Sequence, residues 1–231
     1  MQQFTCYGDK RYRGYCVHCG GPDETDDHVP SKVLLDEPYP ANLMVCPSCL
    51  KCNNGLSLDE EYVACLLECV IAGDTHSASI KRPRIARVLD RNEALRRKLS
   101  AAFTEIDGRR VWSVDNQRMT AVLLKLARCH AAYEHNTPQT GTPSRLFYCP
   151  MEILNAVERE DFEGRDEPLI PAWPEVGTRA MQRLLVVGDD VFSEDWLVVQ
   201  PGNYRFRVDA DDGLRVRIVL REYLACEVAW D

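Results

Sequence analysis

No apolar run in the sequence approaches the roughly 20 residues that a membrane-spanning helix needs. The first ten residues, Met1–Lys10, contain no apolar segment of the kind that directs secretion. The chain also shows no internal repeat, no glycine-rich phosphate-binding loop and no Ser–His–Asp order typical of hydrolases. These absences argue against a P-loop enzyme, a serine hydrolase and any membrane partner, and we expect a protein of the reducing cytoplasm.

Net positive charge is also lacking, since 28 Lys and Arg face 36 Asp and Glu, a balance of -8 at pH 7. Phosphate affinity normally comes from Lys and Arg, so this sum argues against a nucleic-acid partner. The distribution of charge along the chain favours such a partner, because residues 81–110 carry ten Lys and Arg against four Asp and Glu. This segment is therefore +6 while the rest of the chain totals -14.

Residues from Pro83 to Leu99 show the spacing of one helix with an apolar side. At about 100° per residue, four basic side chains project within a stripe of about 60° beside that apolar side. They are Arg84, Arg87, Arg91 and Lys98. This stripe is a candidate nucleic-acid-binding surface, and the alternative is an ordinary solvated helix face.

Eleven cysteines would suggest disulfides in a small secreted protein, but four of them follow a metal-ligand pattern. A CxxC turn holds two thiolates close enough for two corners of a tetrahedral zinc site, so two turns can supply all four ligands. The four are Cys16, Cys19, Cys49 and Cys52. Because Cys46-Pro-Ser-Cys49 is itself a CxxC, Cys46 could replace Cys52 as a ligand.

A zinc site with four protein ligands is closed, so its role is structural. Any chemistry must then come from the polar residues that the zinc holds in place. These are Asp27, His28, Asn42 and Asn53. The alternatives are a loop carboxylate and a surface histidine for the first two, and caps or turns for the two asparagines.

Along the chain these residues form a CxxC pair, Asp27-His28-Val29-Pro30, Asn42-Leu43, and a second CxxC followed directly by Asn53. This order resembles the HNH endonucleases, in particular the zinc-stapled branch of the ββα-metal nucleases that includes phage junction-resolving enzymes of the endonuclease VII type. The resemblance covers residues 12–60. It favours Cys49 and Cys52 as the second ligand pair, because Asn53 then follows the final ligand as it does in the family.

The resemblance implies metal-dependent hydrolysis of phosphodiester bonds in DNA. This reaction needs a deprotonated water in line with the scissile bond and positive charge against the leaving oxygen. His28 would be the general base, because an imidazole with an ordinary pKa of about 6.5 is largely neutral at cellular pH. Asp27 and Asn53 would offer oxygen ligands to a catalytic Mg²⁺ or Mn²⁺, and Asn42 would brace the loop opposite His28.

The resemblance also implies a phage, mobile-element or anti-phage defence setting. Two alternatives stay open: a zinc-dependent module that binds nucleic acid or protein without catalysis, and a nuclease that acts on RNA. Because one HNH module makes one cut, double-strand cleavage would require a homodimer, a larger assembly or two binding events.

We predict an α+β protein with an HNH module at residues 1–58 and a mixed domain of unknown role at residues 59–231. Strand-like runs separated by turn residues fill the C-terminus. They are Leu184–Val187, Trp196–Gln200, Tyr204–Val208, Leu214–Leu220 and Tyr223–Ala229.

Two helices are predicted outside the basic segment. Ser57–Ile71 opens with a capping box in its first four residues and is stopped by Gly73. Residues 117–135 form the other, with His130 on its apolar face, so a core role is more typical for His130 than a ligand role.

Two of the strand-like runs alternate apolar residues with arginine on either side of Asp209–Gly213. A hairpin would set four arginines on one face, namely Arg205, Arg207, Arg215 and Arg217. Like charges placed in this way repel unless an anion or acidic side chains lie among them. The face is therefore either a second nucleic-acid or ligand surface or a set of internal ion pairs.

Overall fold

The computed structural model describes residues 14–40, 43–135, 138–164, 192–193, 196–210 and 213–231. It contains helices and antiparallel sheets, which confirms the predicted α+β class. The chain divides into two compact units, one made of Met1–Asn54 with Leu123–Asp231 and the other of Gly55–Val122. Residues 14–54 of the predicted nuclease module therefore belong to the same unit as the C-terminal sheet.

The N-terminal part of the first unit has the order strand, strand, helix. Strand β1 (Thr25–Val29) pairs antiparallel with β2 (Met44–Ser48), and helix α1 (Leu50–Gly55) follows. A 3₁₀ turn, η2 (Lys32–Leu34), lies between the strands in sequence. The Glu24 carboxylate accepts a hydrogen bond from the first amide of α1, at 2.9 Å, which suits the positive end of a helix.

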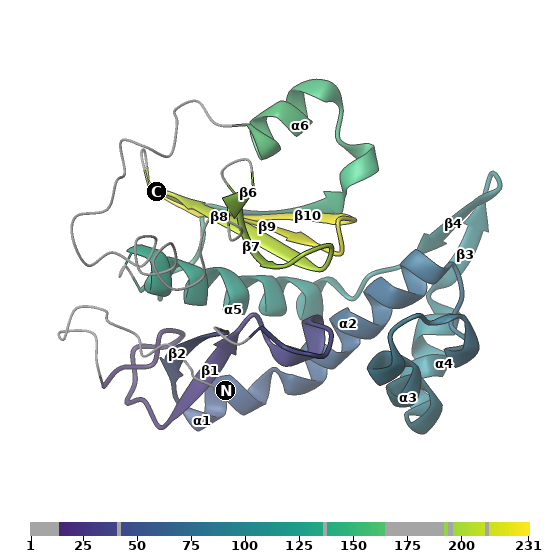
Figure 1. The fold of residues 1–231 in the computed structure, drawn as a ribbon, viewed down its shortest axis with the longest axis horizontal. Coiled ribbons are helices and arrows are strands. Elements are labelled where there is room, and N and C mark those ends of the chain that lie inside the picture. The colour runs from purple at the N-terminus through teal and green to yellow at the C-terminus, as the bar shows by residue number, and fades with distance from the viewer. Residues whose placement is uncertain (1–13, 41–42, 136–137, 165–191, 194–195, 211–212) are drawn as a thin grey trace. The chain divides into compact units, whose positions relative to one another are not determined.

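A six-stranded antiparallel sheet forms the C-terminal part of the first unit (Figure 1), in the order β5-β10-β9-β8-β7-β6. The strands are β5 (Arg145–Pro150), β6 (Phe192–Ser193), β7 (Trp196–Gln200), β8 (Tyr204–Asp209), β9 (Leu214–Leu220) and β10 (Leu224–Trp230). Sequence patterns predicted β7 to β10 but neither β5 nor β6. The predicted strand Leu184–Val187 lies outside the described residues.

Helices α5 (Asn116–His135) and α6 (Ala156–Glu163) lie on opposite faces of this sheet (Figure 1). On the α5 face, the His130 ring stacks on Phe206 with centroids 3.7 Å apart. The His130 Nε2 atom also hydrogen-bonds the Tyr204 hydroxyl at 2.7 Å. The expectation that His130 is a core residue is therefore confirmed.

The arginine face of the sheet meets α6. The Nη1 atoms of Arg207 and Arg217 donate to Gly164 O at the end of α6, at 2.7 and 3.4 Å, where a helix favours cations. Asp209 accepts from both guanidiniums. The acidic partners of Arg205 are Glu163 and Glu222, and those of Arg215 are Asp161 and Glu227. The structure thus confirms internal ion pairing for these four arginines.

The second unit begins with α2 (Ser57–Ala72), which ends at Gly73 as predicted, with Gly73 in the left-handed conformation at φ 68°. The predicted capping box is wrong. Ser57 is the first helical residue, and Leu56 occupies the cap position without a side-chain cap. The chain reaches α2 almost directly from α1, so no extended segment precedes Ser57 to place it as a cap.

The single helix predicted from Pro83 is two helices, α3 (Pro83–Arg91) and α4 (Glu93–Ala101). Asn92 separates them with φ -105° and ψ 76°, and its Oδ1 accepts from Leu95 N at 3.0 Å to cap α4. The side chain of an asparagine competes with helix hydrogen bonding in this way. The prediction of one continuous basic stripe is therefore wrong, because Lys98 belongs to α4.

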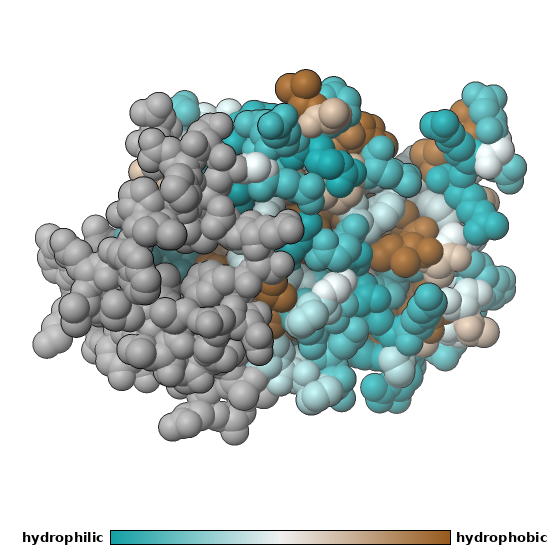
Figure 2. Space-filling model, turned by 45° about the horizontal axis from the view of Figure 1, so that its top comes forward, coloured by the Kyte–Doolittle hydropathy of each residue, from teal (hydrophilic) through white to brown (hydrophobic). Residues whose placement is uncertain are grey.

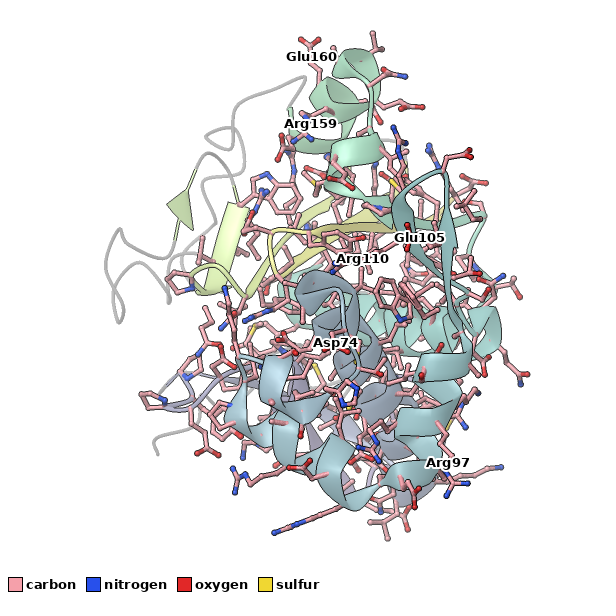
Figure 3. The ribbon with its side chains drawn as sticks, turned by 90° about the vertical axis from the view of Figure 1, so that its right-hand side faces the viewer. Asp74, Arg97, Glu105, Arg110, Arg159 and Glu160 are labelled. Atoms are coloured by element: carbon pink, nitrogen blue, oxygen red, sulfur yellow. The ribbon has the colours of Figure 1, made fainter. Side chains whose placement is uncertain are left out.

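A hairpin of β3 (Phe103–Ile106) and β4 (Arg109–Trp112) follows α4 and was not predicted. Its turn is Asp107-Gly108, with φ of 51° and 73°, the positive values that an Asp-Gly hairpin turn requires. The Nη1 atom of Arg110, a residue labelled in Figure 3, donates to Gly73 O at 3.1 Å, which fastens β4 to the end of α2.

Among the described residues, no helix has both the length and the apolar character needed to cross a membrane. On the face drawn in Figure 2, hydrophobic residues form separate small patches among hydrophilic ones. Scattered exposure of this kind is ordinary and marks no interface by itself.

Candidate metal centre

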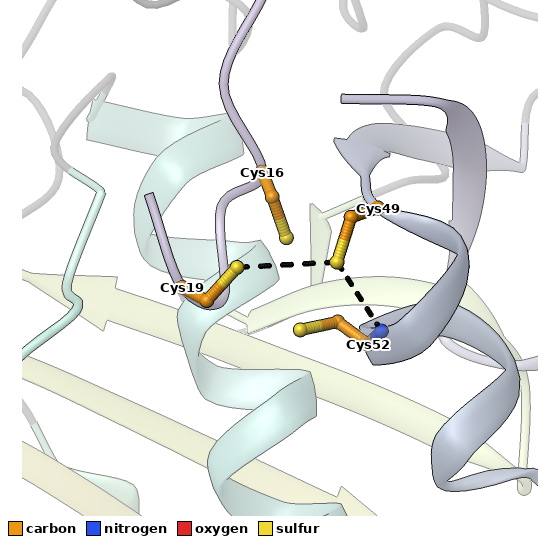
Figure 4. A group of neighbouring side chains, drawn as sticks. All are labelled: Cys16, Cys19, Cys49 and Cys52. Carbon is orange, nitrogen blue, oxygen red and sulfur yellow. Dashed lines mark hydrogen bonds between the residues drawn. The ribbon is translucent and has the colours of Figure 1, made fainter. Parts of the chain in front are cut away.

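Four cysteine sulfurs converge from two turns of the chain (Figure 4). Cys16 and Cys19 precede β1, whereas Cys49 and Cys52 lie at the start of α1. All four sulfur atoms lie within 4.8 Å of one another, and those of Cys19 and Cys49 are 3.9 Å apart. Zn–S bonds of about 2.3 Å imply S···S edges of about 3.8 Å in a tetrahedron, so this four-cysteine group can hold a structural zinc ion.

The surroundings of the four-cysteine group suit a bound cation. Burial alone would raise the pKa of the Cys16 thiol, but backbone N–H groups of Cys49, His18 and Cys19 outweigh it and lower the pKa to about 6. Burial and the neighbouring sulfurs raise the pKa of Cys52. Cys16 therefore readily forms a thiolate. Cys52 resists deprotonation unless a cation lies among the four sulfurs.

Arg128 of α5 braces the first cysteine turn. Its Nη1 atom donates to His18 O at 3.1 Å, and its Nη2 atom donates to the carbonyls of Thr140 and Gly141, both at 3.0 Å. This contact also brings a positive charge towards the sulfurs. A zinc ion with four thiolates carries a net charge of about -2, which a nearby guanidinium stabilises.

Cys46 is not part of the four-cysteine group. Its Sγ atom donates to the backbone carbonyl of Cys129 at 3.4 Å, and the residue is buried. The structure therefore assembles the second ligand pair from Cys49 and Cys52, the register that the sequence favoured.

Asp27 lies on the buried face of β1. Its Oδ2 atom is 3.1 Å from Nζ of Lys125 on α5 and 3.1 Å from Nε2 of His18. The side chains of Lys125 and Asp27 are only 3% and 4% exposed. His18, Asp27 and Cys129 also lie together at ligand distances, but Lys125 already supplies the cation that a buried carboxylate needs. We interpret this cluster as a buried ion pair.

His28 lies on the opposite face of β1, because successive side chains of a strand alternate. It is half-buried, and burial followed by the nearby Lys32 lowers the pKa of His28 below its ordinary 6.5. The imidazole is therefore neutral at pH 7 and able to accept a proton.

Asn53 on α1 contacts the same strand. Its Nδ2 atom donates to the backbone carbonyl of Asp26 at 3.2 Å, two residues before His28. The Asp26 side chain is exposed and shares the His28 face, since the two are two positions apart in the strand. The structure thus places Asp26 and His28 on one face of β1 and Asn53 against the backbone of the same strand, while Asn42 lies outside the described residues.

The predicted ligand pair for a catalytic cation, Asp27 with Asn53, fits the structure poorly. A hard cation at the Asp27 carboxylate would have to displace the Lys125 ammonium from a buried position. Asn53 remains suitable, because it donates through Nδ2 and its amide oxygen can face a cation.

The predicted phosphate-binding residues belong to the second unit. Arg87 and Arg91 on α3 are exposed and Arg84 is half-buried. Lys98 instead forms an ion pair with Asp115 at 2.7 Å. The preceding residue of α4, Arg97 (labelled in Figure 3), pairs with Glu93 at 2.9 Å, and both side chains are mostly exposed.

The loop between β1 and β2 is fastened to the end of β7 and to two turns of the C-terminal sheet, a contact that the sequence did not predict. Asp36 and Gln200 exchange two hydrogen bonds between backbone and side chain, at 2.8 and 2.9 Å. The Asp36 carboxylate also accepts from Asn203 at 2.9 Å and from Arg221 at 3.2 Å. The sheet therefore holds the segment that follows His28.

Sequence reasoning also missed His18, Lys125 and Asp26. His18 could have been noticed inside the first CxxC, and Asp26 from the alternation of a strand ending at His28. Lys125 gave no signal, since it is one residue of an otherwise apolar helix face.

Comparisons with protein-family models, curated proteins and solved structures found no match.

Proposed function

We propose that this protein is a metal-dependent HNH endonuclease that hydrolyses phosphodiester bonds of DNA. The observation that carries the proposal is the contact of Asn53 with β1 two residues before His28, in a strand–strand–helix unit closed by the four-cysteine group. The zinc-stapled HNH pattern implies these residues in these places. The contact joins the helix that carries a candidate oxygen ligand to the strand that carries a candidate base.

His28 acts as the general base in this mechanism. Its lowered pKa keeps the ring neutral at pH 7, so it can take a proton from a water positioned against the scissile phosphorus. The leaving oxygen then develops negative charge. A bound Mg²⁺ or Mn²⁺ would neutralise that charge, with Asn53 as one oxygen ligand.

DNA binding by an acidic chain requires a local basic surface, and α3 with Arg84, Arg87 and Arg91 is the proposed one. None of the ten cysteines that the structure describes forms a disulfide, which suits a reducing cytoplasm. The resemblance places such an enzyme in a phage, mobile-element or anti-phage defence setting, with a dimer needed for double-strand cuts.

The alternative is a zinc-dependent module that binds nucleic acid or protein without cleaving it. The observation in its favour is the burial of Asp27, because the expected ligand of a catalytic metal is held by Lys125. The remaining alternative is a nuclease specific for RNA, which would use the same base and the same cation.

Supercoiled plasmid and a structured RNA, each incubated with the zinc-loaded protein and Mg²⁺ or Mn²⁺, distinguish these functions. We expect plasmid relaxation or linearisation that EDTA abolishes. Cleavage of the RNA alone would support the RNA nuclease, and binding without cleavage of either substrate would support the binding module.

A further inference from the structure

We propose that the carboxylate of Asp26, and not that of Asp27, holds the divalent cation beside His28, and that Asp27 anchors β1 to the rest of its unit. This inference rests on the proposed function, because it assigns the cation ligand of that site.

The charge of the Asp27 carboxylate is already balanced by the Lys125 ammonium. The Asp27 Oδ2 atom is within 3.1 Å of both Lys125 Nζ and His18 Nε2. All three side chains are at most 6% exposed, so a cation bound to this oxygen would have to give up most of its water. Magnesium gives up its waters reluctantly and prefers sites where it can keep several of them.

Side chains of β1 alternate between a buried and an accessible face. Asp27 and Val29 are buried, whereas Asp26 is exposed and His28 is half-exposed. Asp26 and His28 therefore share the face that water and a phosphodiester can reach. Asp26 and Asp27 thus lie on opposite faces of β1, and only Asp26 shares the face of His28.

Helix α1 contacts β1 at Asp26. The Asn53 Nδ2 atom donates to the backbone carbonyl of Asp26 at 3.2 Å, which holds the Asn53 side chain beside this residue. One carboxylate oxygen, one amide oxygen and several waters make up the partly hydrated shell that Mg²⁺ and Mn²⁺ accept. Phosphate oxygens of the substrate can replace some of those waters.

The anchoring role of Asp27 follows from its partners. His18 lies inside the first cysteine turn, Lys125 lies on α5, and Asp27 directly precedes His28. One carboxylate thus links the zinc-binding turn, the helix under the sheet and the strand of the base. Its loss should change folding stability rather than cation affinity.

The test is titration of the zinc-loaded full chain with Mn²⁺, followed by electron paramagnetic resonance of the unbound ion. Mn²⁺ binds nitrogen and sulfur ligands less tightly than zinc does, so it leaves the zinc of the four-cysteine group in place. Four single variants are compared with the wild type: Asp26→Asn, Asp27→Asn, Asn53→Ala and, as a matched charge control at an exposed carboxylate, Asp23→Asn.

We expect Asp26→Asn to weaken Mn²⁺ binding by about tenfold or more, since even outer-shell partners of a metal contribute that much. Asn53→Ala should weaken it as well, while Asp23→Asn leaves it unchanged. Asp27→Asn should retain Mn²⁺ affinity and lose thermal stability. If it does not fold, the double variant Asp27→Asn/Lys125→Met removes both buried charges and takes its place.

Loss of Mn²⁺ binding in folded Asp27→Asn or in the double variant, with binding retained in Asp26→Asn, would overturn the assignment. Absence of Mn²⁺ binding in the wild type would overturn it too. Mn²⁺ binding that depends on Asp26 without cleavage of DNA or RNA would support the cation site while contradicting the proposed nuclease.

Discussion

At the scale of single residues, the ion pair between Asp27 and Lys125 predicts a large effect on stability. Lys125→Met leaves the Asp27 carboxylate buried without its cation, so we expect a loss of about 3–5 kcal/mol of unfolding free energy. Urea denaturation of the zinc-loaded protein measures it. Lys51→Met, at an exposed lysine of α1, is the matched control and should change stability little. Equal stability of the two variants would contradict the anchoring role of Asp27.

The assignment of Cys52, and not Cys46, as a zinc ligand predicts how much zinc each cysteine variant binds. Cys52→Ser should lower bound zinc well below that of the wild type and destabilise the N-terminal part, because zinc binding contributes folding free energy. Cys46→Ser should keep its zinc, since the Cys46 sulfur contacts Cys129 and not the four-cysteine group. Metal analysis of the purified variants measures the zinc bound per chain. Loss of zinc in Cys46→Ser with zinc retained in Cys52→Ser would refute this ligand set.

The zinc ligands could be predicted because CxxC spacing is a local property of the chain. The burial of Asp27 could not, because it depends on Lys125, which is 98 positions further along the sequence. The motif specified the residue type at position 27, but the packing of α5 decides what that carboxylate can bind.

At the scale of elements, the ion pairs between Asp209 of β8 and the two arginines that contact the end of α6 predict that folding stability depends on pH. Burial would raise the pKa of the Asp209 carboxyl, but Arg217 and Arg207 outweigh it and hold the pKa below its usual value. A depressed folded-state pKa stabilises the protein above the unfolded value of about 3.9, and that contribution disappears as pH falls through the folded pKa.

Asp209→Asn should therefore cost about 2 kcal/mol at pH 7, the size of a charge-assisted hydrogen bond, and the cost should shrink below about pH 4. Chemical denaturation of both proteins between pH 7 and pH 3 tests this expectation. A difference between the two proteins that stays constant across this range would show that the charge of Asp209 does not act through Arg207 and Arg217.

Helix α3 predicts how an acidic chain holds DNA. Replacing Arg84, Arg87 and Arg91 with Glu should weaken binding uniformly across DNA sequences, because phosphate contacts carry no base information. Losing about three contacts should flatten the slope of log affinity against log salt by roughly 2 to 3 units. Fluorescence anisotropy at several salt concentrations measures the slope, with zinc content as the folding control. An unchanged slope would show that α3 is merely solvated.

Helices and strands with a long repeating pattern of apolar residues could be predicted from the sequence. A boundary that depends on one side chain could not. Residues 117–135 and the arginine-alternating strands matched α5, β8 and β9 because their apolar spacing extends over many residues. The break at Asn92 depends on one side chain that caps α4. Helix α6 was missed although its capping box at Asn155 is visible in the sequence.

At the scale of the whole chain, the proposed nuclease residues belong to a larger unit than the motif suggests. Residues 14–54 share a unit with Leu123–Asp231, and Asp36 fastens the loop after β1 to the sheet. These contacts join residues more than 160 positions apart, a separation that local patterns do not report. The C-terminal sheet is therefore part of the scaffold of the site.

The measurement that tests the central claim most directly is the rate of plasmid nicking by the wild type and by His28→Ala, at equal zinc content and saturating Mg²⁺. If His28 activates water, the variant should lose at least about 10² in rate, within the range of general-base catalysis. Its zinc content and melting temperature should match the wild type, because His28 supplies none of the four sulfur ligands and its side chain is only half-buried. Nicking by folded His28→Ala at the wild-type rate would contradict the account.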